Sequence, residues 1–201
     1  MALSTYAELQ TAIADFLNRD DLGTAAQTFI QLAEAQIARD VRHWRMEKRS
    51  TATFDEGEEW LPSDWAETIR LGVVDGREIR MVSEAEMMRL RTENTSGNTQ
   101  IPVYTIVAGQ IDIFPTLSEA VELVYFARVP ALSDSNTTNW LLTYAPDVYL
   151  YGALMHSAGY LKDDGRVAIW TGLYTAAVGN LNNSSMAAKS SGPLRMNMPR
   201  G

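Results

Sequence analysis

The stretch that decides the fold runs from Trp140 to Asn182 and reads WLLTYAPDVYLYGALMHSAGYLKDDGRVAIWTGLYTAAVGNLN. Its pattern predicts two helices, over residues 143–162 and 164–182, joined by a tight polar turn. Pro146 suits a first helical turn, because that position has no intrahelical N–H bond to lose.

The first of these helices carries two apolar rows at helical spacing. The rows are Val148, Tyr151, Met155 and Ala158 on one side, and Leu150, Leu154 and Leu161 on the other. A helix that is apolar on two sides must be covered on two sides. We therefore expect a neighbouring copy of the chain to cover part of this hairpin. The predicted subunit contacts are Tyr151, Met155, Trp170 and Tyr174.

The second helix is expected to be capped by Asp163 or Asp164 and to end at Asn182-Asn183. Its apolar residues fall on one face, namely Val167, Trp170, Leu173, Tyr174, Ala177, Val178 and Leu181. The region 132–183 is thus predicted to be a helical hairpin. The chain enters it through a polar linker over residues 130–139, most of which is counted in this region.

The N-terminal region 1–49 is predicted to form another antiparallel helical hairpin, with a first helix over residues 3–18 and a second that fades near His43-Trp44. Both helices are expected to start with a capping box, in which two side chains bond reciprocally to the first turn. The two pairs are Thr5 with Glu8, and Thr24 with Gln27. We expect the two hairpins to pack together as one bundle.

Between the hairpins, the pattern changes to short segments of period two, which is typical of half-buried strands. The expected strands are 50–54, 68–74, 78–81, 103–107, 110–114 and 121–128, with a short helix between Ser83 and Arg91. The pair 68–74 and 78–81 is expected to form a hairpin around Asp75-Gly76. The predicted fold is therefore α+β: an antiparallel helical bundle with an inserted sandwich- or barrel-like region at 50–131.

The last segment, 184–201, is rich in Ser, Asn, Gly, Pro and Met and is predicted to be an extended arm. It contains three basic residues and no acid, whereas the whole chain has a formal net charge of −8. A basic arm on an acidic body indicates a binding partner. The residues expected to dock are Lys189, Leu194, Arg195, Met196, Met198 and Arg200.

Composition excludes several classes of function. With no cysteine, the chain has no disulfide framework and no thiolate nucleophile or metal ligand. No apolar run is long enough to cross a membrane, and the N-terminus does not resemble a signal peptide. The negative charge argues against tightly gripped DNA, which requires a basic surface.

The sequence contains no set of side chains with the types and spacing of catalytic residues. His43 and His156 are isolated in the sequence and lack the spacing of metal ligands. The acidic residues around Gly57 (Asp55, Glu56, Glu58 and Glu59) favour a solvated turn over the paired carboxylates of a glycoside hydrolase. The five tryptophans are expected in the core or at interfaces. We expect no enzyme activity, no cofactor and no metal.

Several stretches stand out by their order and spacing. They are 29–42 (FIQLAEAQIARDVR), 61–65 (LPSDW), 101–106 (IPVYTI), 121–126 (VELVYF), and, within the opening stretch, WLL, APD, LYGAL and YLKDDGR. Together they resemble the head–tail adaptor (connector) proteins of tailed phages. The resemblance covers about residues 5–182.

The resemblance implies a structural virion protein at the head–tail junction, made in the bacterial host cytoplasm. Such adaptors form a ring, usually of twelve copies, beneath the portal, and dock on the portal through a C-terminal arm. DNA passes through the ring without sequence-specific binding, and tail nozzle or fibre proteins are the partners on the other side. Two alternatives stay open: a tail-associated cell-wall hydrolase acting through Glu58 and Glu59, and a monomeric protein-binding module.

Overall fold

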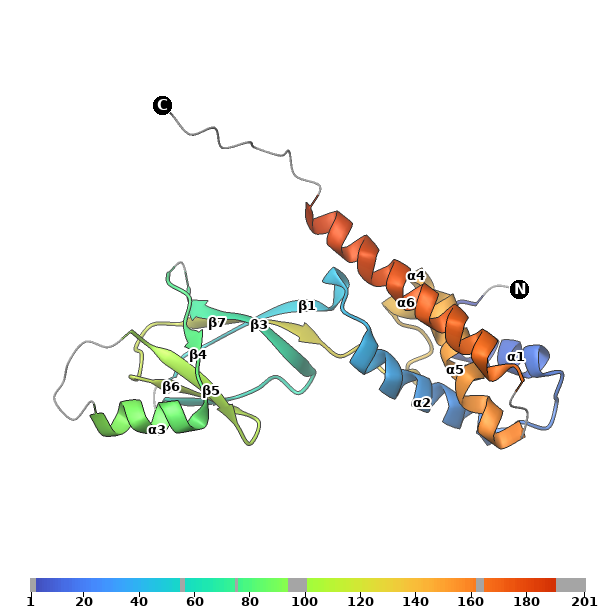
Figure 1. The fold of residues 1–201 in the computed structure, drawn as a ribbon, viewed down its shortest axis with the longest axis horizontal. Helices are drawn as coiled ribbons and strands as arrows, with labels where there is room; N and C mark the ends of the chain where they lie inside the picture. The colour runs from blue at the N-terminus through green and yellow to red at the C-terminus, as the bar shows by residue number, and fades with distance from the viewer. Residues whose placement is uncertain (1–2, 55–56, 75, 94–100, 162–164, 191–201) are drawn as a thin grey trace, which may run out of the picture. The chain divides into compact units, whose positions relative to one another are not determined.

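The computed structural model describes residues 3–54, 57–74, 76–93, 101–161 and 165–190. The chain folds into two compact units (Figure 1), each of which is described by itself. The helical unit contains residues 1–44 and 129–201, and the β unit contains residues 45–128. The mixed composition of helices and sheets confirms the predicted α+β class.

The helical unit is built around one central helix. Its elements are α1 (Tyr6–Leu17), α2 (Thr24–Asp40), α4 (Trp140–Tyr144), α5 (Pro146–Leu161) and α6 (Val167–Ser190). Helix α5 contacts each of the other four, and eight of its sixteen residues are buried. The chain itself therefore buries Val148, Leu150, Leu154 and Ala158 of the two apolar rows. Tyr151, Met155 and Leu161 are half-buried, and the expected contact with a second copy stays a prediction.

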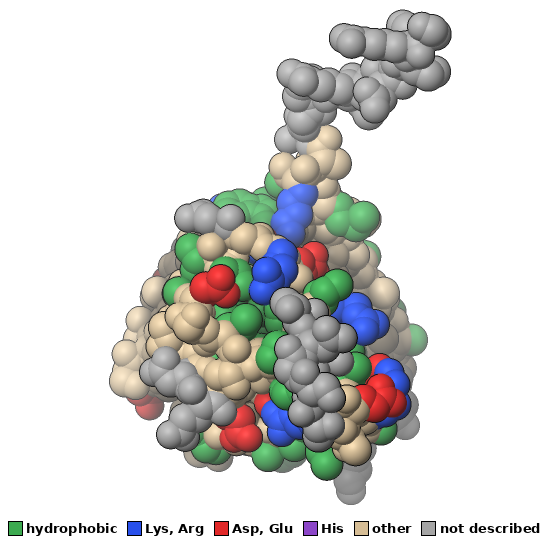
Figure 2. Space-filling view, turned by 90° about the vertical axis from the view of Figure 1, so that its left-hand side faces the viewer, with side chains coloured by type: hydrophobic (Ala, Val, Ile, Leu, Met, Phe, Trp, Pro, Cys, Tyr) green, Lys and Arg blue, Asp and Glu red, His purple; other side chains and the backbone are tan. Residues whose placement is uncertain are grey.

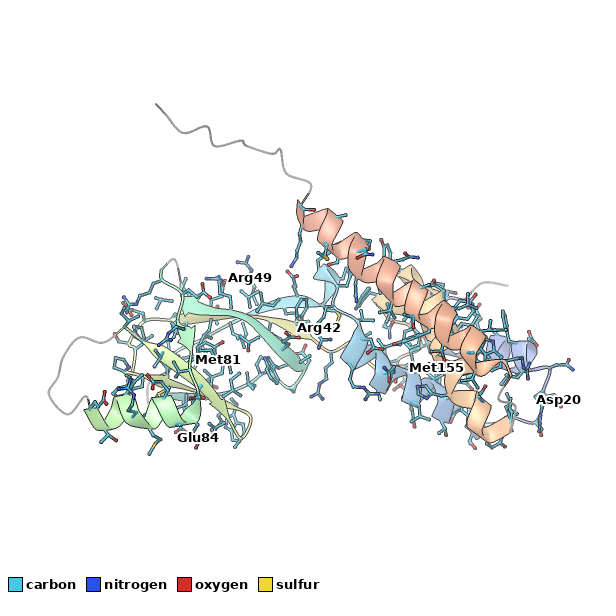
Figure 3. The ribbon with its side chains drawn as sticks, in the orientation of Figure 1. Asp20, Arg42, Arg49, Met81, Glu84 and Met155 are labelled. Carbon is cyan, nitrogen blue, oxygen red and sulfur yellow. The ribbon has the colours of Figure 1, made fainter. Side chains whose placement is uncertain are left out.

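Gly152 marks the closest approach in this unit. A Cβ atom at this position would lie 3.2 Å from the Ala33 Cβ of α2 and 3.3 Å from the Tyr174 ring of α6. Because it has no side chain, α5 can lie tightly between the two helices. Met155, one turn further along α5, lies in the same region of the unit (Figure 3) and is half-buried.

Local signals explain most helix starts. The capping box of α1 is confirmed, since Glu8 N donates to Thr5 Oγ1 at 3.3 Å and Thr5 N donates to Glu8 Oε2 at 3.0 Å. Pro146 is the first residue of α5, as predicted. The second capping box is wrong: Thr24 is already helical and the N-cap is Gly23, whose φ of 43° favours glycine.

Residues 140–144 form a helix of their own, α4, where the sequence suggested only the approach to α5. Asn139 caps it, because the Leu142 amide donates to Asn139 Oδ1 at 2.9 Å. The predicted cap of α6 at Asp163-Asp164 lies outside the described residues.

Helix α6 does not end at Asn182-Asn183 but continues to Ser190. The prediction of an extended arm is therefore wrong for residues 184–190, and 191–201 lie outside the described residues. The reason is that Asn182 and Ser185 turn their polar side chains toward the end of α2, so they are tertiary contacts and not helix breakers.

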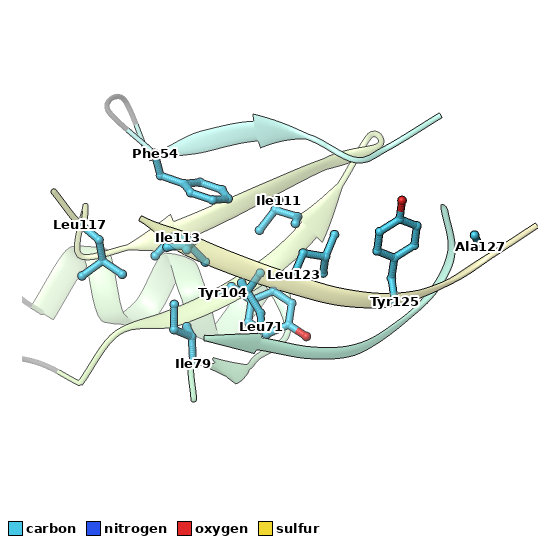
Figure 4. Close-up of a cluster of buried hydrophobic side chains, with 11 residues drawn as sticks. Phe54, Leu71, Ile79, Tyr104, Ile111, Ile113, Leu117, Leu123, Tyr125 and Ala127 are labelled. Carbon is cyan, nitrogen blue, oxygen red and sulfur yellow. The ribbon is translucent and has the colours of Figure 1, made fainter. Parts of the chain in front are cut away.

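The β unit consists of two sheets that face each other across one core (Figure 4). One sheet has the order β1-β7-β3, with strands β1 (Glu47–Ala52), β7 (Val121–Ala127) and β3 (Trp65–Val73), all antiparallel. The other has the order β2-β6-β5-β4, with β2 (Glu58–Trp60), β6 (Gln110–Phe114), β5 (Val103–Val107) and β4 (Arg80–Met81). Helix α3 (Glu84–Glu93) contacts β5, and the short 3-10 helix η1 (Trp44–Met46) precedes β1.

One predicted hairpin divides between the two sheets. Ile79 N donates to Leu71 O at 2.8 Å, as in a hairpin with β3. The next residues, Arg80 and Met81, instead pair parallel with β5 in the other sheet. This short segment joins the sheets because Ile79 itself is buried in the shared core.

A half-buried carboxylate fixes the linker before α4. Glu34 Oε1 accepts bonds from the Leu132 amide at 2.7 Å and from the Tyr149 hydroxyl at 3.3 Å. Asn139 Nδ2 in turn donates to the Tyr149 hydroxyl at 2.7 Å. Burial raises the pKa of Glu34 above its ordinary value, although both bonds that it accepts act in the opposite direction.

The crowding at Gly152 can be tested with one chemical change at two positions of α5. Gly159 has open space around it, so Gly159→Ala should stabilise the fold by up to about 1 kcal/mol through helix propensity. Gly152→Ala gains the same propensity but forces α2 and Tyr174 apart, and overpacking costs about 1–3 kcal/mol. Urea unfolding should rank Gly152→Ala below Gly159→Ala; equal stabilities would contradict the close approach.

The Glu34 site predicts a pH dependence. A carboxyl whose pKa is raised by folding contributes stability below its unfolded pKa of about 4.3, and this contribution is lost as the pH rises through the folded value. Glu34→Gln keeps the acceptor oxygen and removes the ionisation. Melting temperatures measured from pH 4 to pH 7 should therefore fall less, or rise more, in the variant than in the wild type. Parallel curves would exclude this role.

Candidate functional site: the outer face of α6 and the end of α2

The functional candidates of the helical unit gather on α6. No charged residue occurs between Val167 and Ala188, a run of 22 residues that the structure describes throughout. Exposed helix faces of globular proteins normally carry charged and polar side chains. This helix is therefore unusual, because one side of it is exposed to solvent and still carries no charge.

The exposed side forms a continuous strip, here called the outer face of α6. Its residues are Ile169, Gly172, Leu173, Ala176, Asn180, Asn183 and Ala187, which recur at spacings of three and four and are all exposed. Ile169 is 62% exposed. Small and apolar side chains of this kind allow another helix to approach closely, and no repelling charge opposes it.

The opposite side of α6 holds the end of α2. The Arg42 amide donates to Asn182 Oδ1 at 3.0 Å, and Asn182 Nδ2 donates to Asp40 O at 3.0 Å. The last carbonyls of a helix have no intrahelical partner, so Asn182 supplies one from a segment 142 residues away. Arg42 lies where α2 ends (Figure 3).

Two further bonds strengthen this attachment. Trp44 N donates to the buried Ser185 Oγ at 2.8 Å. The Tyr174 hydroxyl donates to Asp40 Oδ2 at 3.1 Å, and burial raises the pKa of Tyr174. Residues 40–44 are therefore held along three turns of α6, from Tyr174 to Ser185.

An aromatic cluster lies at the same end of α2. The buried His43 ring stacks on Trp140, with centroids 5.3 Å apart, and has Tyr144 at 5.8 Å and Trp44 at 5.5 Å. Trp44 and Tyr144 are nevertheless 43% and 51% exposed. Both rings thus present an aromatic surface to solvent next to the Ser185 contact.

The four predicted subunit contacts differ in how far they are exposed in the structure. Tyr151 and Met155 are half-buried. Trp170 and Tyr174 are only 7% and 4% exposed, with the Arg166 guanidinium 5.0 Å above the Trp170 ring. These two side chains belong to the chain's own core. The exposed residues that could face a neighbour, Ile169 and Leu173, were missed, although the absence of charge along α6 is a signal that the sequence contains.

Of the predicted docking arm, only Lys189 is described, and it is exposed in the last turn of α6. Leu194, Arg195, Met196, Met198 and Arg200 lie outside the described residues. The prediction that they dock is therefore carried forward as a proposal.

The structure gives little support to the pair of glutamates in the hydrolase alternative. Glu58 and Glu59 are successive residues of β2, so their side chains point to opposite faces of the sheet. Asp55 and Glu56 lie outside the described residues. A hollow of about 210 Å³ beside α3 includes Glu58 and Asp112, but Asp112 is paired with Arg91 at 2.5 Å.

The two histidines likewise provide no metal site among the described residues. His156 Nε2 is buried without a hydrogen-bond partner among the described residues, and burial, with a smaller effect of Arg39, lowers its pKa. Within the described residues, no three His, Cys, Asp or Glu side chains are placed to hold a metal. No described helix has the length and apolar character required to span a membrane.

On the face of the β unit that Figure 2 presents, the described acidic and basic side chains are interspersed among apolar ones. This surface therefore differs from the outer face of α6, where charge is missing.

Comparison with known families matches the chain to one of them: the model of the SU10 adaptor protein family covers residues 4–197. The chain belongs to this family. The SU10 adaptor family is a family of phage adaptors, so the chain is a structural component of the virion. No curated protein matches the sequence. The adaptor assignment agrees with the resemblance seen in the sequence, at the level of the phage adaptor class.

The attachment of α2 to α6 predicts that replacing two neighbouring asparagines by alanine has unequal effects on the stability of this adaptor. Asn182→Ala removes the Asn182 bonds to the Arg42 amide and to the Asp40 carbonyl and should cost about 1–3 kcal/mol of stability. The same change at the exposed Asn183 should stay within about 0.5 kcal/mol. Both variants gain the same helix propensity, so denaturant unfolding isolates the tertiary bonds, and equal stabilities would contradict the attachment.

Proposed function

We propose that this adaptor assembles as a ring on the portal and joins it to the tail, with the outer face of α6 as the contact between neighbouring subunits. The observation that carries the proposal is the 22-residue run of α6 without charge, whose outer face is exposed. A contact between two different surfaces of identical subunits generates a closed ring when the rotation per subunit divides the circle. Twelve copies is the number that the resemblance implies.

The net charge suits a passage for DNA. With a formal charge of −8 per chain, a ring of subunits repels the phosphate backbone, so DNA can move through without being held. The C-terminal segment 191–201, with Lys189 at its base, docks on the portal in this proposal. Tail nozzle or fibre proteins are the partners of the β unit.

The ring contact is tested by placing a charge on the outer face. Ala176→Glu buries a carboxylate in the proposed contact, where an unpaired charge is strongly unfavourable. Thr175→Glu puts the same charge on an exposed residue of another side of α6 and is the matched control. Mass measurements and electron micrographs of each variant mixed with portal should show rings for the control and none for Ala176→Glu.

Thermal unfolding checks that both variants fold. If Ala176→Glu folds and still forms rings at the wild-type portal concentration, the outer face of α6 is not the subunit contact.

The docking segment is tested by deleting only residues 191–201. A deletion from residue 184 would also remove Ser185, whose hydroxyl binds the Trp44 amide, and would confuse docking with folding. Loss of co-sedimentation with portal is the expected result. Undiminished binding by the truncated chain would exclude the segment as the docking arm.

A further inference from the structure

We propose that the aromatic cluster formed by His43, Trp44, Trp140 and Tyr144 is the seat of the chain's own C-terminal segment 191–201 before assembly. The cluster and the base of that segment lie close together in the helical unit. Ser185 contacts the Trp44 backbone, and α6 continues for five residues beyond it. At 1.5 Å per residue this places Ser190 about 7–8 Å along the helix from the Ser185 contact.

The length of the remaining chain permits a return. Eleven residues follow Ser190, and an extended chain spans up to about 3.3–3.6 Å per residue. The segment can therefore reach Trp44 and Tyr144 with several residues to spare. Gly192-Pro193 follows the described helix after one residue, Ser191, and such dipeptides favour turns.

The chemistry of the segment fits an aromatic surface. Residues 191–201 contain two prolines, two methionines and two arginines, and no acid. Methionine sulfur contacts aromatic ring edges favourably, and arginine stacks on aromatic faces as a cation. Proline-rich segments dock on grooves lined with aromatic side chains. Trp44 and Tyr144 expose such rings, and the buried His43 ring contacts both of them and Trp140.

Tethering makes weak contacts sufficient. A short flexible linker holds its end at an effective concentration in the millimolar range. A few contacts to Trp44 and Tyr144 are then enough to seat the segment most of the time. Release of the segment when the portal binds rests on the proposed function, but the seating itself does not require a portal.

The absence of cysteine from the natural chain allows a direct test on the full-length protein. Thr143→Cys places a thiol on an exposed residue next to Tyr144, and Met198→Cys places one in the segment. Under mild oxidation the pair should form a disulfide, detected by mass spectrometry, at a rate that does not change on dilution. The control pair, Thr28→Cys with Met198→Cys, lies near the far end of α2 and should react at least about tenfold more slowly.

A second comparison distinguishes a segment that binds the aromatic cluster from one that is only tethered near it. Trp44→Ala with Tyr144→Ala, added to the reactive pair, should slow disulfide formation at least about fivefold. Tyr160→Ala, an exposed aromatic outside the cluster, should leave it unchanged. If the double variant unfolds, Met196→Ser with Leu194→Ser changes only the segment and should give the same slowing.

Three results would overturn the proposal. A rate that the aromatic and segment substitutions leave unchanged shows a tether without a seat. A rate proportional to protein concentration shows that the segment binds a second copy. Equal rates for the Thr143 and Thr28 pairs show no preferred position. Portal docking is measured separately, so its failure leaves these outcomes intact.

Discussion

The bonds between α6 and the end of α2 are the constraint on which the rest of the helical unit depends. Asn182 and Ser185 hold the backbone of residues 40–44, and Tyr174 holds the Asp40 side chain. This attachment fixes where the chain leaves α2 for the β unit, and it keeps α6 helical beyond its apolar residues. It also turns the polar side chains of Asn182 and Ser185 inward, and the outer face of α6 that is left to solvent carries no charge.

The sequence predicts the local parts of this fold well. Thr5 with Glu8, Pro146 and the alternating strands are signals that act within a few residues, and the structure agrees with them. Asn182 and Ser185 were misread because their partners lie about 140 residues away. Without those partners, Asn-Asn-Ser-Ser favours the end of a helix. Likewise, nothing local in 78–81 shows that Arg80 and Met81 join the other sheet.

The sequence predicts a contact surface on the C-terminal helical hairpin, but two of the four residues it assigns to that surface are buried in the chain's own core. Apolar rows identify helices that need cover, but they do not reveal which neighbour provides it. Trp170 and Tyr174 are covered by the chain itself, whereas Tyr151 and Met155 of α5 are only half-buried. The informative signal is an absence. The long run without charged residues indicates a contact surface on the solvent side of α6, whereas the large apolar residues indicate the side that faces the core. The aromatic cluster could not be predicted, since His43 and Trp140 meet only after the end of α2 and α4 have packed together.

The strands that lead into and out of the β unit are direct neighbours, with Glu47 of β1 opposite Phe126 of β7. The inserted residues therefore begin and finish at adjacent backbone positions. The length of the segment between them can therefore change without moving apart the two chain ends that connect the β unit to the helices.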